Sequence, residues 1–219
     1  MEKFKMNILH YLYDPFCGWC YGAAPLLTKA MEVEGLAIIP HGIGMLSGDS
    51  RKFMSAEWRD FVRPHEERIT AFSKQVFGNA YVHGLQERTD ILLDSSIPTA
   101  AMLAALKIDG RSVEMLKKLQ IAYYQEGRAI ADRDGILNIA VEQGYDKSEF
   151  STTFDVIMAN EVKEHIDESH QLMNQLDLQG VPGLVLQTEK EMHVFPFGKY
   201  ISRLDRFEHD LRKFTNPTL

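Results

Sequence analysis

The sequence predicts an α/β domain that is interrupted by a large all-helical insertion. Strand, helix and strand patterns fill the first part of the chain, and strand, strand and helix patterns fill the last part. Consecutive helical patterns lie between them. The length of 219 residues suits one large domain with an insertion, at about 150 residues per domain. We therefore expect residues 1–48 and 160–219 to form the α/β domain and residues 49–159 to form the insertion.

The first part begins with a short buried strand. Residues 8–13 are mostly aliphatic and aromatic, and Asp14-Pro15 ends this run. A helix follows over residues 17–35, in which Pro25 predicts a kink. Residues 36–40 form the second strand candidate, and a glycine-rich loop comes after it.

The middle of the chain shows helical spacing of apolar residues throughout, with no strand pattern. Pro64 is expected to interrupt the first of these helices, and Asp146-x-x-Glu149 is typical of a capping box that begins a later one. The predicted helices span residues 58–76, 98–108, 112–126 and 134–143, followed by a long pattern from residue 146 that ends at Gly180.

The last part returns to strand patterns. Residues 183–187 and 192–195 are strand candidates, and the polar residues 188–191 between them predict a hairpin. An amphipathic helix over residues 201–211 follows. These strands can join those of the first part in one sheet.

Composition and charge exclude several classes of protein. Hydrophobic residues make up 45% and charged residues 25%, as in globular proteins. The net charge of −7 repels phosphate backbones and anionic membranes, so no nucleic-acid or membrane partner is expected. The N-terminal segment has neither a secretory signal pattern nor a membrane span. We therefore expect a cytoplasmic protein, in which paired cysteines serve catalysis or metal binding.

Cys17 and Cys20, the two cysteines of the chain, lie where the first strand gives way to a helix. The first turn of a helix offers unpaired N–H groups and the positive end of its dipole, which stabilise a thiolate at Cys17. Cys20, one turn further, is near enough to form a disulfide with Cys17 and to resolve a mixed disulfide on it. Between them, Gly18 limits crowding and Trp19 covers the pair with an apolar face. The pattern predicts a redox-active dithiol.

Other interpretations of the cysteines are weaker. A zinc site needs four ligands, and His165 and His170 are too far along the chain and five residues apart on a helix, which turns them about 140° from each other. No metal is therefore expected. A structural disulfide and two inert thiols are disfavoured by the compartment and by the position at a helix start. His10 and His41 are assigned no role.

The active-site segment resembles that of thioredoxin-fold proteins. The resemblance rests on Cys17-Gly18-x-Cys20 with Pro25 after it, and on Gly180-Val181-Pro182, which is similar to the cis-proline loop of that fold. Together with the helical insertion, the chain resembles the DsbA family, especially its cytosolic branch akin to the FrnE-type disulfide isomerases. Residues 13–22 and 94–134 are similar to that branch. The resemblance implies a thioredoxin fold with a large all-helical insertion.

The resemblance also implies roles for the loop before the third strand and exposes two departures. A cis bond before Pro182 would let Val181 present its backbone N–H and C=O to a substrate polypeptide facing the cysteines. Thioredoxin and DsbA carry a buried acid six residues before the nucleophile, where this chain has Tyr11, so the proton acceptor for Cys20 is unassigned. The Pro-His pair of strong oxidants is replaced by Gly18-Trp19, which favours a reductase or isomerase over an oxidase.

The expected function is that of a thiol-disulfide oxidoreductase acting on polypeptide or small disulfides. It needs no cofactor besides the Cys17–Cys20 pair, with glutathione as a candidate co-substrate. Two alternatives stay open. The first is a glutathione-dependent isomerase or transferase, because the chain also resembles the kappa-class glutathione transferases and the 2-hydroxychromene-2-carboxylate isomerases. Those enzymes have a serine at the position of Cys17. A redox-regulated chaperone would use the helical block to hold clients. Neither the substrate, the electron donor, the reduction potential nor the oligomeric state follows from the sequence.

Overall fold

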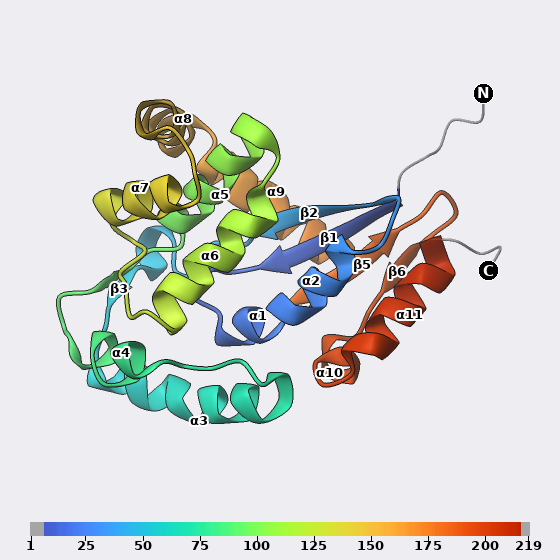
Figure 1. The fold of residues 1–219 in the computed structure, drawn as a ribbon, viewed down its shortest axis with the longest axis horizontal. Coiled ribbons are helices and arrows are strands. Elements are labelled where there is room, and N and C mark those ends of the chain that lie inside the picture. The colour runs from blue at the N-terminus through green and yellow to red at the C-terminus, as the bar shows by residue number, and fades with distance from the viewer. Residues whose placement is uncertain (1–6, 216–219) are drawn as a thin grey trace.

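A four-stranded mixed sheet lies at the centre of the computed structural model, which describes residues 7–215 (Figure 1). The strand order is β2-β1-β5-β6. β1 (Asn7–Tyr13) is parallel to β2 (Leu36–Gly42) and antiparallel to β5 (Gly183–Gln187), and β6 (Met192–Val194) is antiparallel to β5. The prediction that the two ends of the chain share one sheet is confirmed.

The pairing of β1 with β5 determines which loops meet. Leu12, near the end of β1, pairs with Gly183 at the start of β5. Because the two strands are antiparallel, the segment after β1 and the segment before β5 lie at the same end of the sheet. The first segment contains Cys17 and the second contains Pro182. The fold therefore brings together two motifs that are far apart in the sequence.

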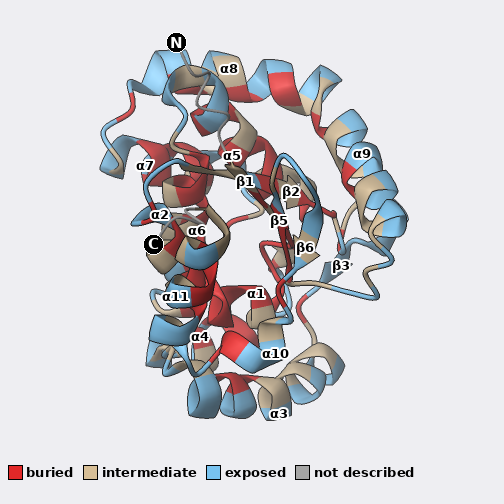
Figure 2. Ribbon diagram, turned by 90° about the vertical axis from the view of Figure 1, so that its right-hand side faces the viewer, coloured by how far each residue is buried: buried red, intermediate tan, exposed pale blue. Residues whose placement is uncertain are grey.

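Helices cover both faces of the sheet (Figure 2). α2 (Ala24–Met31) and α11 (Leu204–Thr215) pack together on one face, and α9 (Val162–Gln175) contacts β2 on the other. Val185 and Leu186, neighbours in β5 whose side chains point to opposite faces, are both fully buried. Burial on both faces explains why β1 and β5 are almost continuously apolar.

Proline positions differ from two of the sequence-based expectations. The helix predicted over residues 17–35 is two helices, α1 (Gly18–Gly22) and α2, and Pro25 lies in the first turn of α2, where a missing N–H costs nothing. α3 (Ala56–Ser73) instead continues through Pro64. Both Pro64 and Asp60, whose carbonyl group loses its partner, are exposed, so water can satisfy that carbonyl.

The remaining predicted helices follow the predicted order with shifted ends, whereas two short helices, Asn79–Val82 and Phe197–Tyr200, were not predicted. The predicted N-cap at Asp146 is present, because its carboxylate accepts a hydrogen bond from the Glu149 N–H at 2.9 Å. The long pattern after it divides at Glu161, and the chain leaves α9 at Leu176, earlier than the predicted Gly180. The elements are α4 (Asn79–Val82), α5 (Ser96–Asp109), α6 (Ser112–Tyr124), α7 (Arg133–Glu142), α8 (Lys147–Asn160) and α10 (Phe197–Tyr200).

A second, two-stranded sheet contradicts the expectation of a strand-free insertion. β3 (Lys52–Phe53) pairs antiparallel with β4 (Leu92–Leu93). Each strand has two residues, too few to produce an alternating pattern. Two short 3₁₀ helices, Gly48–Ser50 and Leu85–Glu87, also lie in segments for which no helix is predicted.

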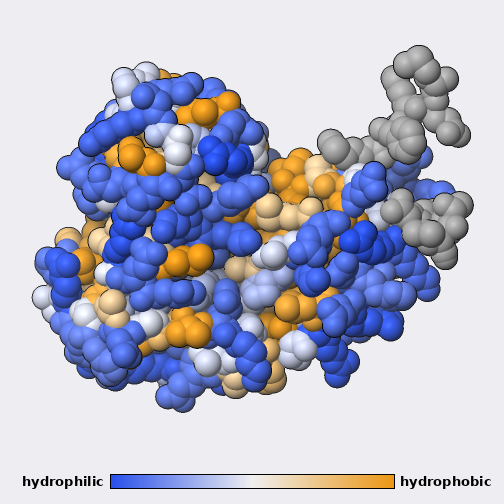
Figure 3. Space-filling model, in the orientation of Figure 1, coloured by the Kyte–Doolittle hydropathy of each residue, from blue (hydrophilic) through white to orange (hydrophobic). Residues whose placement is uncertain are grey.

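Two apolar clusters form the core, and each draws residues from both parts of the chain. Met102 and Leu116 of the helical region belong to the cluster around the sheet, whereas Phe16 and Tyr21 belong to the cluster inside the helical region. The predicted boundaries at residues 48 and 160 stay predictions, and the outer ends of the predicted α/β domain, residues 1–6 and 216–219, lie outside the described residues. Within residues 7–215, no helix is long and apolar enough to span a membrane. The face seen in Figure 3 is largely hydrophilic, with small apolar areas.

Candidate active site

Cys17 and Cys20 lie at the start of α1, just beyond the end of β1. Cys17 is the N-cap residue and has an extended backbone, and its carbonyl group accepts hydrogen bonds from the N–H groups of Cys20 at 2.9 Å and Tyr21 at 3.1 Å. Cys17 is 9% exposed and Cys20 is fully buried. The two thiols are therefore inequivalent, and a substrate can approach only the first.

The Val181–Pro182 loop faces Cys17. Its peptide bond is cis, and the Cys17 S–H donates to the Val181 carbonyl oxygen at 3.9 Å. The structure thus brings together both cysteines and both members of this loop. Trp19 lines a hollow together with Val181 and Pro182, and Gly18 and Trp19 also contact the helix α3.

Gly18 and Trp19 form the contact between α1 and α3. A Cβ atom on Gly18 would lie 3.0 Å from the Cδ1 atom of Ile69, so the missing side chain lets α3 approach closely. The Trp19 Nε1–H donates to Nδ1 of His65 at 3.4 Å, and the Arg68 guanidinium lies 5.6 Å from the centre of a Trp19 ring. α3 therefore brings a histidine and an arginine beside the dithiol. The sequence did not signal either residue, because the apolar spacing of this segment indicated only a packed helix.

Two hollows flank Trp19. The larger, of about 410 Å³, lies between α3, α10 and the cis-proline loop, and its lining includes Arg68, Phe72 and Pro182. The smaller, of about 160 Å³, lies between α1 and the helical region and is lined by Cys17 and by aromatic side chains that include Phe61. Phe61 and Phe72, which lie on α3 at the smaller and the larger hollow, are 60% and 47% exposed. The dithiol thus lies beside apolar surface on two sides.

Asp14 organises the turn that carries Cys17. Its fully buried carboxylate accepts hydrogen bonds from the Phe16 N–H at 2.9 Å, the Met45 N–H at 2.6 Å and the Ser95 hydroxyl at 3.0 Å. Burial raises the pKa of Asp14 to about 6, although these three hydrogen bonds oppose the shift. In the sequence, Asp14-Pro15 indicates only the end of a strand. The signal that could have revealed the role of Asp14 was its position, three residues before the first cysteine.

The environment of Cys20 disfavours its thiolate. Burial raises the pKa of Cys20, and the hydrogen bond and charge interaction with Cys17 raise it further, as does the negative charge of Asp14. Tyr11, at the position of the acid in related folds, donates its hydroxyl to the Cys20 carbonyl oxygen at 3.1 Å. Burial raises the pKa of Tyr11 well above its usual range, so this phenol stays protonated. Tyr11 is a hydrogen-bond donor here and does not replace the acid as a base.

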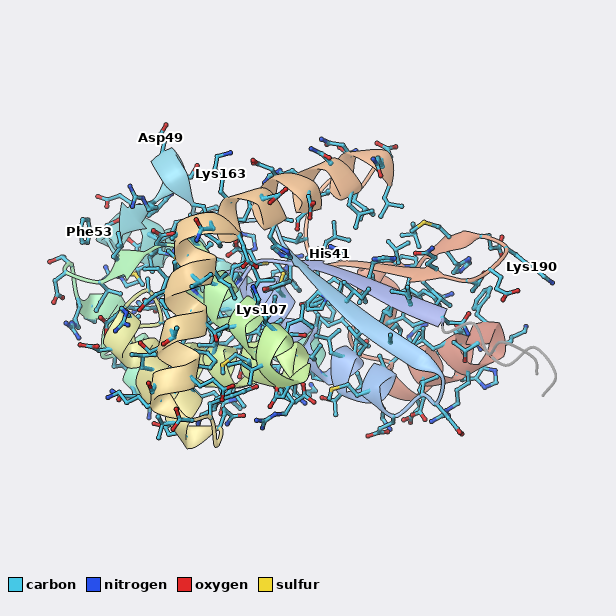
Figure 4. All side chains as sticks on the ribbon, turned by 90° about the horizontal axis from the view of Figure 1, so that it is seen from above. His41, Asp49, Phe53, Lys107, Lys163 and Lys190 are labelled. Atoms are coloured by element: carbon cyan, nitrogen blue, oxygen red, sulfur yellow. The ribbon has the colours of Figure 1, made fainter. Side chains whose placement is uncertain are left out.

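Four histidines gather on the opposite face of the sheet, between the end of β2 and α9. Figure 4 labels His41 at this place. His41 and His10 are joined by a 2.9 Å hydrogen bond, Nε2 of His165 accepts from the Gly42 N–H at 3.0 Å, and Nε2 of His170 lies 2.6 Å from the Ile43 carbonyl oxygen. Although five residues apart, His165 and His170 both reach the end of β2. Within residues 7–215, no group of three or more His, Cys, Asp or Glu is arranged to hold a metal ion.

We expect this histidine cluster to make folding sensitive to acid. Burial lowers the pKa of His41 and of His165 from 6.5 to about 4, so below pH 6.5 the unfolded chain binds protons that the folded chain excludes. Between pH 7.5 and pH 5 the free energy of unfolding should fall by about 1–2 kcal/mol for each ring. Urea unfolding at both pH values tests this. Between these pH values, the double variant His41→Gln, His165→Gln should lose less stability than the wild type. The exposed control His209→Gln should lose as much as the wild type. Equal losses in the wild type, the double variant and the control would contradict the assignment.

One partly exposed thiol and one buried thiol at the end of a thioredoxin-like sheet define a class of protein, the thioredoxin-fold thiol-disulfide oxidoreductases. The chain belongs to the DSBA-like thioredoxin domain family, whose model matches residues 8–212. This confirms the predicted fold and makes the protein a disulfide oxidoreductase or isomerase. A comparison with curated protein sequences finds no match.

Solved structures give a similar result. The cytosolic disulfide reductase DsbM from Pseudomonas aeruginosa is 38% identical, with a TM-score of 0.90 over 96% of this chain and 100% of that chain. The same protein with GSH is 39% identical, with a TM-score of 0.87 over 94% and 98% of the two chains. A 2-hydroxychromene-2-carboxylate isomerase, 15% identical with a TM-score of 0.59 over 97% and 100%, shares the fold alone.

Proposed function

We propose that the protein is a cytoplasmic disulfide reductase in which Cys17 is the nucleophile and Cys20 the resolving cysteine. The observation that carries the proposal is the asymmetry of the pair: Cys17 is 9% exposed and contacts the Val181 carbonyl oxygen, whereas Cys20 is fully buried. An incoming disulfide meets Cys17 first. The description of the similar DsbM as a cytosolic disulfide reductase supports the direction and the compartment.

The reaction consists of two exchanges. The Cys17 thiolate attacks one sulfur of the substrate disulfide, which forms a mixed disulfide and releases the other sulfur as a thiolate that takes up a proton. Cys20 then loses its proton and attacks the Cys17 sulfur, which releases the second substrate thiol. The substrate gains two electrons and the protein forms the Cys17–Cys20 disulfide. Two thiols of glutathione can reverse these steps on the protein and leave as glutathione disulfide.

Substrate binding uses the loop before β5. The Val181 backbone lies beside Cys17 and can pair with the backbone of an extended peptide on either side of its cysteine. Glutathione and a polypeptide cystine both offer such a backbone. The similar DsbM, whose structure was solved with GSH, supports glutathione as a ligand of this protein.

The reduction potential tests this proposal. The purified protein is equilibrated in glutathione redox buffers, and its free thiols are counted by alkylation and mass spectrometry. A reversible two-electron couple below about −250 mV is expected of a reductase. A potential near about −150 mV would make the protein an oxidant or isomerase. If Cys17 and Cys20 never form a disulfide while glutathione stays bound, the protein is a glutathione-dependent isomerase or transferase instead.

A further inference from the structure

α3 carries three arginines, and they differ in whether a carboxylate neutralises their charge. Arg59 and Arg63 both bind the Glu87 carboxylate, at 2.6 and 3.1 Å. Arg68 forms no ion pair with any residue in the described range 7–215. Its guanidinium instead lies over Trp19, 5.6 Å from the centre of a ring. A cation stacked on an aromatic ring keeps its N–H groups free for another acceptor.

Arg68 also lines the larger hollow, as do Val181 and Pro182 of the cis-proline loop. The hollow has a volume of about 410 Å³, within the range of small-ligand sites. Its other walls are mainly apolar and include Phe72, Val181 and Phe197. Trp19, on which Arg68 stacks, lies between the two cysteines in the sequence. The free guanidinium is therefore held at one wall of the hollow, and the backbone that faces Cys17 forms another.

Because the protein is negatively charged, the Arg68 cation indicates which kind of ligand the hollow can bind. The chain carries a net charge of −7, so its long-range field repels an anionic ligand. A planar guanidinium binds a carboxylate through two parallel hydrogen bonds, which gives both attraction and orientation. A neutral disulfide gains nothing from such a group, but a small peptide thiol with terminal carboxylates does.

We propose that Arg68 is a specificity-determining residue that binds a terminal carboxylate of glutathione and orients its sulfur toward Cys17. This inference rests on the proposed function, because it assigns the ligand of the same site. Extended glutathione spans about three residues, or roughly 10 Å, so its cysteine can pair with Val181 while its terminal carboxylate reaches the wall formed by Arg68. Arg68 takes no part in the sulfur exchange.

Single-turnover oxidation of the reduced protein tests the proposal. The loss of free thiols is followed by quenched alkylation after mixing with glutathione disulfide or with neutral 2-hydroxyethyl disulfide. For Arg68→Met, the second-order rate with glutathione disulfide should fall about tenfold, equivalent to ~1.4 kcal/mol. Its rate with the neutral disulfide should stay within about twofold of the wild type. Arg68→Lys should recover part of the loss, because it keeps the charge without the planar fork.

The control variant is Arg63→Met, which removes the same charge from the same helix but breaks an ion pair outside the larger hollow. It should leave both rates close to those of the wild type. If Arg68→Met slows both disulfides equally, or slows neither, the proposal is wrong. If the wild type is oxidised by neither disulfide, the proposed function itself fails, so the two failures are distinguishable.

Discussion

Replacing Cys20 with serine should trap a mixed disulfide on Cys17. In the proposed mechanism, the Cys20 thiol, which is fully buried, releases the substrate from Cys17. Serine cannot attack a disulfide, so the first exchange proceeds and the second does not. Incubation of Cys20→Ser with glutathione disulfide should yield one glutathionyl group per chain, located on Cys17 by mass spectrometry. Turnover of a polypeptide disulfide should fall by at least about 100-fold.

Two further variants make this prediction sharp. Cys17→Ser should form no adduct, because the remaining thiol is inaccessible. Cys20→Ala repeats the test without placing a hydroxyl group in a buried position, and it should trap the same adduct. An adduct on Cys20 in the Cys17→Ser variant would mean that the two roles are exchanged. Rapid turnover by Cys20→Ser on a polypeptide disulfide would show that resolution does not need an internal thiol.

The sequence predicted the sheet and the dithiol because both depend on local signals. Buried strands with turn residues at their ends indicated β1, β2 and β5. The spacing of Cys17 and Cys20 at a strand-helix junction indicated a redox-active pair, which stays a prediction. The interruption expected at Pro64 was wrong, because the tolerance of a helix for proline depends on whether the freed carbonyl group faces water. The exposure of that carbonyl group depends on how the helix packs in the folded protein, which the local sequence does not specify.

The side chains around the dithiol could not be predicted in the same way. His65 and Arg68 lie beside Trp19 only because α3 packs against α1 across Gly18, and no pattern in either segment specifies that contact. The histidine cluster is similar. His10, His41 and His165 come from three separate elements, so none of them has a neighbour in the sequence that reveals the others.

Loss of the Asp14 carboxylate should have the largest effect on stability among the variants considered. It joins three segments, namely the turn after β1, the loop after β2 at Met45 and the start of α5 at Ser95. Asp14→Ala leaves two backbone N–H groups and one hydroxyl group without this buried acceptor, at a cost of about 3 kcal/mol in the free energy of unfolding. Asp14→Asn keeps one acceptor oxygen and should lose less. The exposed control Asp49→Asn should be neutral in the same urea titration, whereas a stabilised Asp14→Ala would show that the buried charge is a net liability.

The pH dependence of the stability of Asp14→Asn distinguishes the effect of the Asp14 carboxylate from that of the histidines. Because burial raises the Asp14 pKa from 3.8 to about 6, the folded state takes up a proton first as the pH falls through 6, and this stabilises it by about 1 kcal/mol between pH 7.5 and pH 5. The neutral histidines act in the opposite direction over the same interval, so the two effects partly cancel in the wild type. Asp14→Asn removes only the stabilising part and should therefore lose stability more steeply in acid than the wild type.

Asp14→Asn also removes a negative charge that raises the pKa of Cys20. Resolution of the mixed disulfide should therefore reach its half-maximal rate at a lower pH in this variant. An unchanged rate profile, measured by quenched alkylation across pH, would show that Asp14 serves the fold without influencing the dithiol.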